Sequence, residues 1–179
     1  AYGTAAAGED NVAIGNAAMG GSLVTGAANI AIGVNAGDAL LAGACNVAIG
    51  YGALSGATTG IRNIAIGENA LGTGTLTGIN NTALGENALL TMIGGDNNTG
   101  IGKEAGDALT TGKCNVAMGQ NALGASTTGC QNIAIGDTAL GQGALTGLNN
   151  IAFGTSTMQA LTTGLCNIAI GKSSLSAST

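Results

Sequence analysis

Apolar and polar positions alternate in a short segment that recurs along the whole chain. Each copy begins with Asn, continues with a residue that is usually apolar, a small residue and a second apolar residue, and ends with Gly, as in NIAIG at 63–67. Alternation over so few residues is typical of a β-strand. The apolar positions are mostly Val and Ile, which strands favour.

The Asn anchors define the period of the repeat. Successive anchors lie 17 or 18 residues apart from one end of the chain to the other, and the segment GDAL at 37–40 recurs 69 residues later, at 106–109. A fixed period of this kind indicates a stack of repeats that share one core. The sequence therefore predicts a single repeat domain over 1–179. Its anchors are Asn11, Asn29, Asn46, Asn63, Asn81, Asn98, Asn115, Asn132, Asn150 and Asn167.

Gly follows each strand segment at the same position. Glycine at every copy of one site indicates a corner with positive φ or a close backbone approach. Two variable and often polar residues come next and predict an exposed turn. The corner glycines are Gly15, Gly33, Gly50, Gly67, Gly85, Gly102, Gly119, Gly136, Gly154 and Gly171.

A second apolar stretch, such as 70–71 or 88–89, completes each copy before a closing Thr-Gly. A helix is disfavoured because a Gly within each one would cost about 1 kcal/mol relative to Ala. We expect an all-β, parallel β-solenoid of ten coils, each with two short strands. A spacing of about 4.8 Å between paired strands predicts a rod of roughly 48 Å.

The two faces of the predicted strand differ in side-chain size. We expect the Val and Ile positions to form the core and the small residue between them to face outward, covered by another copy of the chain. A homotrimer about an axis parallel to the rod is the favoured assembly, and a dimer stays open. The interface residues on this hypothesis are Ala13, Ala31, Ala48, Ala65, Ala83, Ala117, Ala134, Ala152 and Ala169.

Composition narrows the classes of partner. Charged residues make up 7% of the chain, the net charge is −5, and the four basic residues are scattered. Nucleic acid is therefore not an expected partner, since phosphate binding needs clustered basic residues. No apolar run reaches the roughly 20 residues of a membrane-spanning helix. We expect no membrane insertion.

Candidate chemistry is sparse. The chain has no His, which removes Ser-His and Cys-His nucleophilic pairs. Glu68 and Glu86 occupy equivalent positions in adjacent copies, and we interpret them as solvated corner charges rather than a glycosidase pair. A corner cation site is a weaker alternative because no calcium-binding loop pattern is present. We expect no catalytic, cofactor-binding or metal-binding residues and no cofactor.

The four cysteines lie close to the Asn anchors. Cys45, Cys114 and Cys166 directly precede an anchor, whereas Cys130 lies one residue earlier in its copy. That offset would point Cys114 and Cys130 apart, although a bridge between them stays an alternative. We expect reduced thiols in a corner ladder.

Threonine recurs before the closing Gly and offers a competing function. A regular Thr ladder on a solenoid can bind ice, but the residue before each Thr varies between Thr, Val and Leu, which breaks the two-row array. The ladder residues are Thr25, Thr59, Thr77, Thr111, Thr128, Thr146 and Thr163.

The motifs NVAIG, NIAIG and NTALG resemble the head repeats of YadA-type trimeric autotransporter adhesins. The longer form NALGASTTGCQNIAIGDTAL, at 121–140, is even more similar to repeat regions in tail-fibre proteins of marine and cyanobacterial phages. The resemblance covers essentially the whole chain. It implies a left-handed parallel β-roll that assembles as a trimer and serves as a rigid shaft or head.

We therefore expect a non-enzymatic structural segment of a phage tail fibre in the virion, supporting host attachment. Its expected partners are further copies of itself, other fibre or baseplate segments, and a host receptor or glycan. Two alternatives stay open: a bacterial adhesin head at the cell surface, and an ice-binding solenoid.

Overall fold

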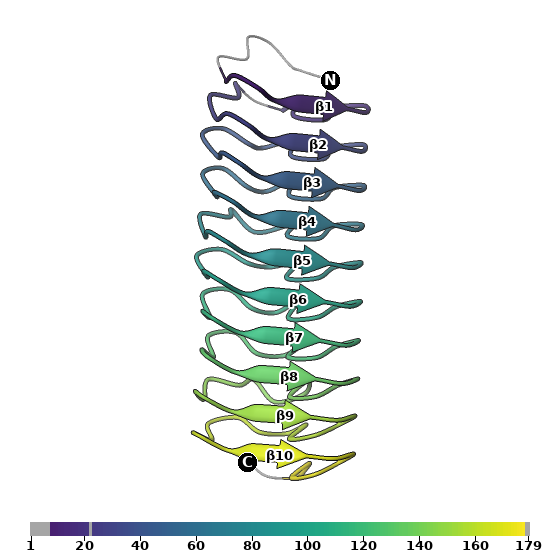
Figure 1. The fold of residues 1–179 in the computed structure, drawn as a ribbon, viewed down its shortest axis with the longest axis vertical. Coiled ribbons are helices and arrows are strands. Elements are labelled where there is room, and N and C mark those ends of the chain that lie inside the picture. Colours follow the sequence, from purple (N-terminus) through teal and green to yellow (C-terminus); the bar gives the residue numbers. More distant parts are fainter. Residues whose placement is uncertain (1–7, 22, 178–179) are drawn as a thin grey trace.

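The computed structural model describes residues 8–21 and 23–177. These residues form a parallel β-solenoid that stacks one coil on the next along a straight rod (Figure 1). The sheet has ten parallel strands in sequence order: β1 (Val12–Ile14), β2 (Ile30–Ile32), β3 (Val47–Ile49), β4 (Ile64–Ile66), β5 (Thr82–Leu84), β6 (Thr99–Ile101), β7 (Val116–Met118), β8 (Ile133–Ile135), β9 (Ile151–Phe153) and β10 (Ile168–Ile170).

Strand pairing is in register with the sequence repeat. Each residue of a strand pairs with its counterpart in the next copy, so that Ala48 pairs with Ala65 and Val47 with Ile64. Equivalent positions of successive coils therefore stack in columns along the rod. This stacking explains the fixed period, because a one-residue slip would exchange the two faces of the strand.

Only one strand forms in each coil of the described chain, so the expectation of two strands per coil was wrong. The second apolar stretch consists of turns, because its backbone enters the left-handed region at alternate residues, such as Asn69 (φ 51°) and Leu71 (φ 50°). This stretch still bonds to the next coil: the Leu54 N–H donates to the Ala70 carbonyl at 2.9 Å, and the Leu71 N–H donates to the Ala88 carbonyl at 3.0 Å.

The Asn anchors form one continuous hydrogen-bonded ladder inside the rod. Each Asn Oδ1 accepts the backbone N–H of the next anchor at 2.8–3.1 Å and its Nδ2 at 3.0–3.3 Å. From Asn11 to Asn150, each Nδ2 also donates to the carbonyl of the closing Gly of its own coil at 2.7–2.9 Å. One side chain thus closes its coil and joins it to the next.

The small residue at the centre of each strand points into the rod, and the interface expectation for it was wrong. Ala31, Ala48, Ala65, Ala83, Ala117, Ala134 and Ala152 are fully buried within the single chain, Ala169 is nearly so, and Ala13 in the first coil is partly buried. The reason is parity: the buried Asn and the small residue two positions later lie on the same face of a strand. The fully buried alanines cannot contact another copy.

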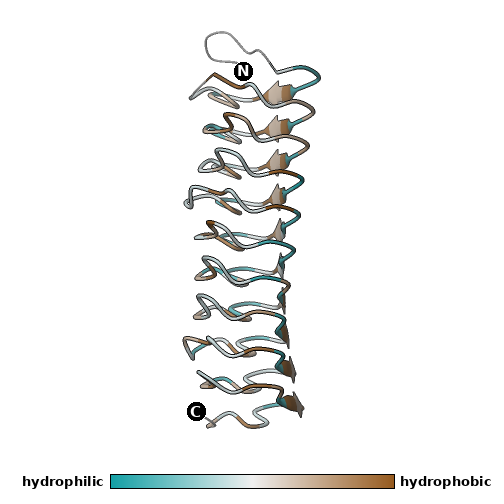
Figure 2. Ribbon diagram, turned by 90° about the vertical axis from the view of Figure 1, so that its left-hand side faces the viewer, coloured by the Kyte–Doolittle hydropathy of each residue, from teal (hydrophilic) through white to brown (hydrophobic). Residues whose placement is uncertain are grey.

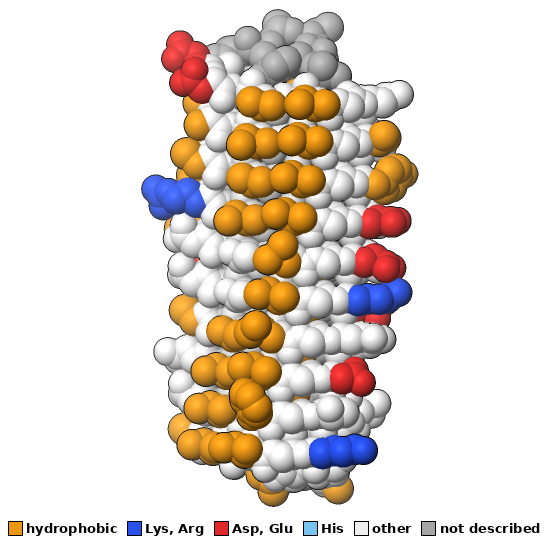
Figure 3. All heavy atoms as spheres, turned by 45° about the vertical axis from the view of Figure 1, so that its right-hand side comes forward, with side chains coloured by type: hydrophobic (Ala, Val, Ile, Leu, Met, Phe, Trp, Pro, Cys, Tyr) orange, Lys and Arg blue, Asp and Glu red, His pale blue; other side chains and the backbone are white. Residues whose placement is uncertain are grey.

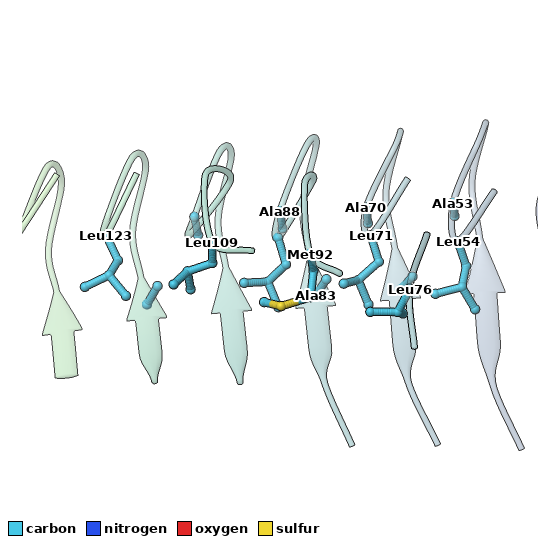
Figure 4. Close-up of a cluster of buried hydrophobic side chains, with 14 of the residues drawn as sticks. Ala53, Leu54, Ala70, Leu71, Leu76, Ala83, Ala88, Met92, Leu109 and Leu123 are labelled. Atoms are coloured by element: carbon cyan, nitrogen blue, oxygen red, sulfur yellow. The ribbon is translucent and has the colours of Figure 1, made fainter. Parts of the chain in front are cut away.

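Leucine and methionine side chains from the second stretch fill most of the remaining interior, together with Val24, Leu76 and Leu145, which precede the closing Thr-Gly (Figure 4). Leu54, Leu71 and Leu123 reach it from a left-handed backbone conformation, which costs roughly 1–2 kcal/mol, whereas burying a Leu side chain contributes about 1.5–3 kcal/mol. The copies with GDAL fill the same interior space with a different residue. Gly37 takes the left-handed position (φ 59°), and a Cβ there would lie 2.8 Å from Cδ1 of Leu40, which fills the space instead.

The corner glycines all have φ between 114° and 137°. From Gly15 to Gly154, a side chain at these sites would also collide with the next coil. At Gly85 a Cβ would lie 2.6 Å from the Gly102 carbonyl oxygen. The corner therefore requires Gly on two independent grounds, conformation and space.

Replacing an inner member of the ladder should destabilise the rod far more than replacing the last. In Asn98→Ala, Asn115 loses the acceptor of its backbone N–H and Nδ2, both at 3.0 Å, and Gly112 loses its donor. Each buried group left unpaired costs about 1–3 kcal/mol, so the free energy of unfolding should fall by about 3 kcal/mol or more. Urea unfolding at one protein concentration measures it. Asn167→Ala, where the ladder ends, is the control, and equal losses in both variants would contradict the ladder's role.

Gly85→Ala should reduce the free energy of unfolding by about 1–3 kcal/mol from backbone conformation alone, with the contact to Gly102 adding to this loss. Gly94→Ala provides the matched control, since its Cβ would come no closer than 3.9 Å to Thr77 Oγ1 and its φ is ordinary. In thermal unfolding, the melting temperature of Gly85→Ala should lie clearly below that of Gly94→Ala. Tolerance of Ala at Gly85 would refute the corner constraint.

Candidate functional site: an exposed apolar strand face

The outward face of the strands carries apolar side chains along the whole described rod. Figure 3 shows them as a continuous stripe over successive coils, and Figure 2 shows the strands aligned along one side of the molecule. We call this surface the strand-face stripe. Its residues are Val12, Ile14, Ile30, Ile32, Val47, Ile49, Ile64, Ile66, Thr82, Leu84, Thr99, Ile101, Val116, Met118, Ile133, Ile135, Ile151, Phe153, Ile168 and Ile170.

The stripe is the set of Val and Ile positions that the sequence analysis assigned to the core. They are exposed or half-buried instead. The exposed fraction of the exposed members ranges from 37% for Ile30 to 72% for Ile170. β-Branched side chains in two adjacent columns make a stiff, flat surface. Monomeric soluble proteins rarely expose contiguous apolar patches of such extent, which makes this surface an interaction site by default.

Two columns of turn residues border the stripe. The pre-strand column is the residue before each anchor Asn, and all its members have φ between 56° and 60°. It consists of Asp10, Ala28, Cys45, Arg62, Asn80, Asn97, Cys114, Gln131, Asn149 and Cys166. The post-strand column is the residue after each corner Gly. It consists of Asn16, Val34, Tyr51, Glu68, Glu86, Lys103, Gln120, Asp137, Thr155 and Lys172.

The charges of the post-strand column are partly paired along the rod. Lys103 Nζ lies 3.2 Å from Glu86 Oε1 and 3.9 Å from Glu104 Oε1, and the hydrogen bond that Lys103 donates to Glu86 raises the pKa of Lys103. Glu68, one coil before Glu86, has no ion-pair partner within the described chain. The carboxylates expected at this corner are thus surface charges stacked coil on coil.

A second ion pair lies on a different edge of the rod. Lys113 Nζ approaches Asp96 Oδ2 to 2.7 Å, and Asp96 Oδ1 accepts the Ile79 N–H at 3.1 Å. The hydrogen bond from Lys113 lowers the pKa of Asp96 despite the opposing effect of burial. The pair joins adjacent coils, so its stabilisation is lost as the pH falls through the lowered pKa of Asp96.

All four cysteines are free thiols in the structure. Cys45, Cys114 and Cys166 are exposed in the pre-strand column, in coils that are not adjacent, and the structure contains no bond between Cys114 and Cys130. Cys130 Sγ instead accepts the Lys113 N–H at 3.3 Å. Three free thiols thus lie in one corner column, in agreement with the expectation of reduced thiols in a corner ladder, and Cys130 lies one residue outside that column.

The threonines before the closing Gly are all exposed. Several hydroxyls donate to a carbonyl of the next coil, as Thr25 does to Leu41 at 3.0 Å and Thr77 to Ile93 at 3.2 Å. Ala42 and Gly94 take the place of Thr in two coils. The Thr column is therefore interrupted, and part of its hydrogen-bonding capacity serves the stack.

Concave sites are absent from the described part of the chain. It holds no pocket, no group of three potential metal-ligating side chains and no helix of membrane-spanning length and hydropathy. Comparison with known protein families, with curated proteins and with solved structures finds no match. The strand-face stripe is consequently the surface of the described chain most suited to an interaction.

Sequence reasoning missed the exposure of the stripe, although the signal was present. The anchor Asn is invariant among the copies and has Ala two residues later in nine of ten. Had the invariant Asn been assigned to the interior, strand alternation would have placed Ala inside and Val or Ile outside. Gly100 supports this, since a Cβ there would lie 2.9 Å from Leu89 Cγ in the core.

Asp107 is a separate polar feature of the GDAL turn. Its Oδ1 is the one buried side-chain nitrogen or oxygen without a hydrogen-bond partner among the described residues. Burial raises the pKa of this carboxyl, and the charge of Glu104 raises it further. The folded state therefore binds the Asp107 proton more tightly than the unfolded chain does, and the ionised form destabilises the fold.

Asp107→Asn should raise the melting temperature by a few degrees at pH 7, and the gain should shrink as the pH falls toward 3, where Asp107 is protonated in both states. Asp38→Asn, at the same position of another GDAL copy, is the control and should show a smaller change, because Asp38 has no buried atom without a partner. A gain that is independent of pH would contradict the assignment.

Proposed function

We propose that this chain is a non-enzymatic structural segment of a phage tail fibre or a comparable surface appendage. In this proposal three copies associate through their strand-face stripes and form a rigid rod that supports host attachment. The observation that carries the proposal is the stripe itself, an apolar surface that runs the length of a straight solenoid (Figures 1 and 3). The motif resemblance to phage tail-fibre repeats supports the same assignment.

The internal construction of the rod suits a mechanical role. Coil-to-coil hydrogen bonds join strands, corners and closing segments, and the Asn ladder runs through the interior. A stack of this kind transmits load along its axis without a hinge, since each coil contacts its neighbours at every column. Other fibre or baseplate segments would continue the rod, and a host receptor or glycan would bind elsewhere on the appendage.

The stripe explains why a single copy would be incomplete. Each coil buries a small interior of Ala, Leu or Met and Asn, and leaves its largest β-branched side chains outside. Association of copies would remove these side chains from water, with a gain of roughly 25 cal/mol for each Å² of apolar surface buried. Stability and assembly would therefore be linked, and the melting temperature would rise with protein concentration.

A bacterial adhesin head is the second candidate, on the strength of the YadA-type motif resemblance. It shares the proposed trimeric rod and differs in that the solenoid surface itself would bind the host. An export signal and a membrane anchor encoded in the same gene would favour it. An ice-binding solenoid would work as a monomer with an exposed flat face, so the oligomeric state separates it from both.

Light scattering on the purified protein should give the mass of three chains, and Met118→Lys should dissociate the assembly. Met118 lies in the stripe with 38% of its surface exposed, and a trimer would bury three lysines close together, each at a cost of several kcal/mol. Ile93→Lys is the matched control, since Ile93 is 45% exposed but lies outside the stripe. A wild-type monomer, or equal effects of the two variants, would overturn the proposal.

A further inference from the structure

We propose that the copies run parallel, related by a rotation axis along the rod, and that Arg62 of one copy pairs with Glu68 of the next. This inference rests on the proposed association through the strand-face stripe. It goes beyond that association by fixing the register and the contacting edges of the copies.

Rotation about an axis parallel to the rod leaves every coil at its own height. When the stripes of neighbouring copies face this axis, the post-strand column of one copy lies beside the pre-strand column of the next. Equivalent coils therefore meet edge to edge. Figure 3 shows the two borders on opposite sides of the stripe, with most of the charges in the post-strand column.

The fourth coil carries the argument from charge. It is the one described coil with a charged residue in both columns, Arg62 before β4 and Glu68 after it, and the two charges are opposite. Neither side chain forms an ion pair within the described chain. They flank the same strand on opposite sides, so they can meet only between copies. An Arg–carboxylate pair is favoured there, because its geometry allows two parallel hydrogen bonds.

The neighbouring coils agree with this arrangement. In the second coil it places Ala28 beside Val34, and in the third coil Cys45 beside Tyr51. Apolar residues thus meet apolar residues at both levels. No coil of the described chain opposes two charges of the same sign.

An antiparallel arrangement fits the same borders less well. A two-fold axis across the rod at its midpoint would place each column against itself, with Arg62 of the fourth coil beside Cys114 of the seventh. Tyr51 would then lie beside Asp137. Glu86 would meet Lys103, but these two already pair within one chain at 3.2 Å. In this antiparallel arrangement no carboxylate would lie beside Arg62.

The stripe narrows at β5 and β6, which adds a second, independent marker of register. Thr82 and Thr99 replace Val or Ile at the start of β5 and β6. Rotation along the rod brings Thr against Thr, whose hydroxyls can hydrogen-bond to one another. A shift of the copies by two or more coils would instead place these hydroxyls against Val and Ile, where they would be buried without partners.

Charge reversal tests the contact. Arg62→Glu should raise the protein concentration at which the assembly half-dissociates by about tenfold or more, equivalent to 1.4 kcal/mol, because each contact then opposes two carboxylates. The double variant Arg62→Glu with Glu68→Arg should restore the wild-type value. Lys172→Glu is the control, since its counterpart across the edge is Cys166. If the double variant does not regain the half-dissociation concentration of the wild type, the Arg62–Glu68 pair is overturned.

Cross-linking tests the direction independently. Gln120→Cys places a thiol beside Cys114 of the next copy, whereas within one chain the two sites flank opposite ends of β7 and lie too far apart for a disulfide. Mild oxidation should give covalent dimers and trimers on a non-reducing gel. Asn16→Cys, whose counterpart is Asp10, should give none.

The outcomes separate the two proposals. An oligomeric wild type in which Gln120→Cys forms no more cross-links than Asn16→Cys would overturn the parallel arrangement and leave the rod assembly standing. A monomeric wild type would overturn both the assembly and its direction. Cross-linking together with recovery of the double charge variant is the result we expect.

Discussion

A carboxamide buried in every coil needs partners for its oxygen and both amide hydrogens, and the architecture of this protein follows from how they are supplied. The oxygen accepts two hydrogen bonds from the next anchor, and the amide reaches back to the previous anchor and across to its own closing Gly. These bonds require every coil to close at the same height and with the same register. Coils of 17 or 18 residues satisfy both conditions.

The ladder also determines the composition of the core. With Asn on the inner face, the residue two positions later is inside as well, and the narrow coil leaves room there only for Ala or Gly. The opposite wall must then supply the larger groups. It does so either with a Leu or Met in a left-handed backbone conformation, as at Leu54, or with Gly37 and a Leu three residues later. Both solutions fill the same space at a conformational cost, which the burial of the side chain offsets.

The exposed stripe is the counterpart of this small interior. Side chains that a globular protein would bury lie outside because the inner face is already occupied. The stripe's apolar character and its length support the proposed association with further copies, and the charges at its borders would give that association a direction. Under this proposal, rigid coil stacking and lateral assembly would both follow from one choice of inner face, and together they would suit a rigid rod.

The sequence by itself determined the period, the parallel stacking and the positions of the Asn and Gly columns, because each depends on residues that recur at fixed spacing and act through local backbone geometry. Only the tertiary structure decided which strand face is inside, because the invariant Asn marks that face only once its buried hydrogen-bond partners are known. Alternation defines two faces without ranking them, and the ranking depends on the bond from Asn98 Nδ2 to Gly112, 14 residues away, and its equivalents. The absence of the predicted second strand has a similar origin. Its alternate left-handed residues, such as Leu71, are held by packing in the closed coil and not by the local backbone preference of the sequence.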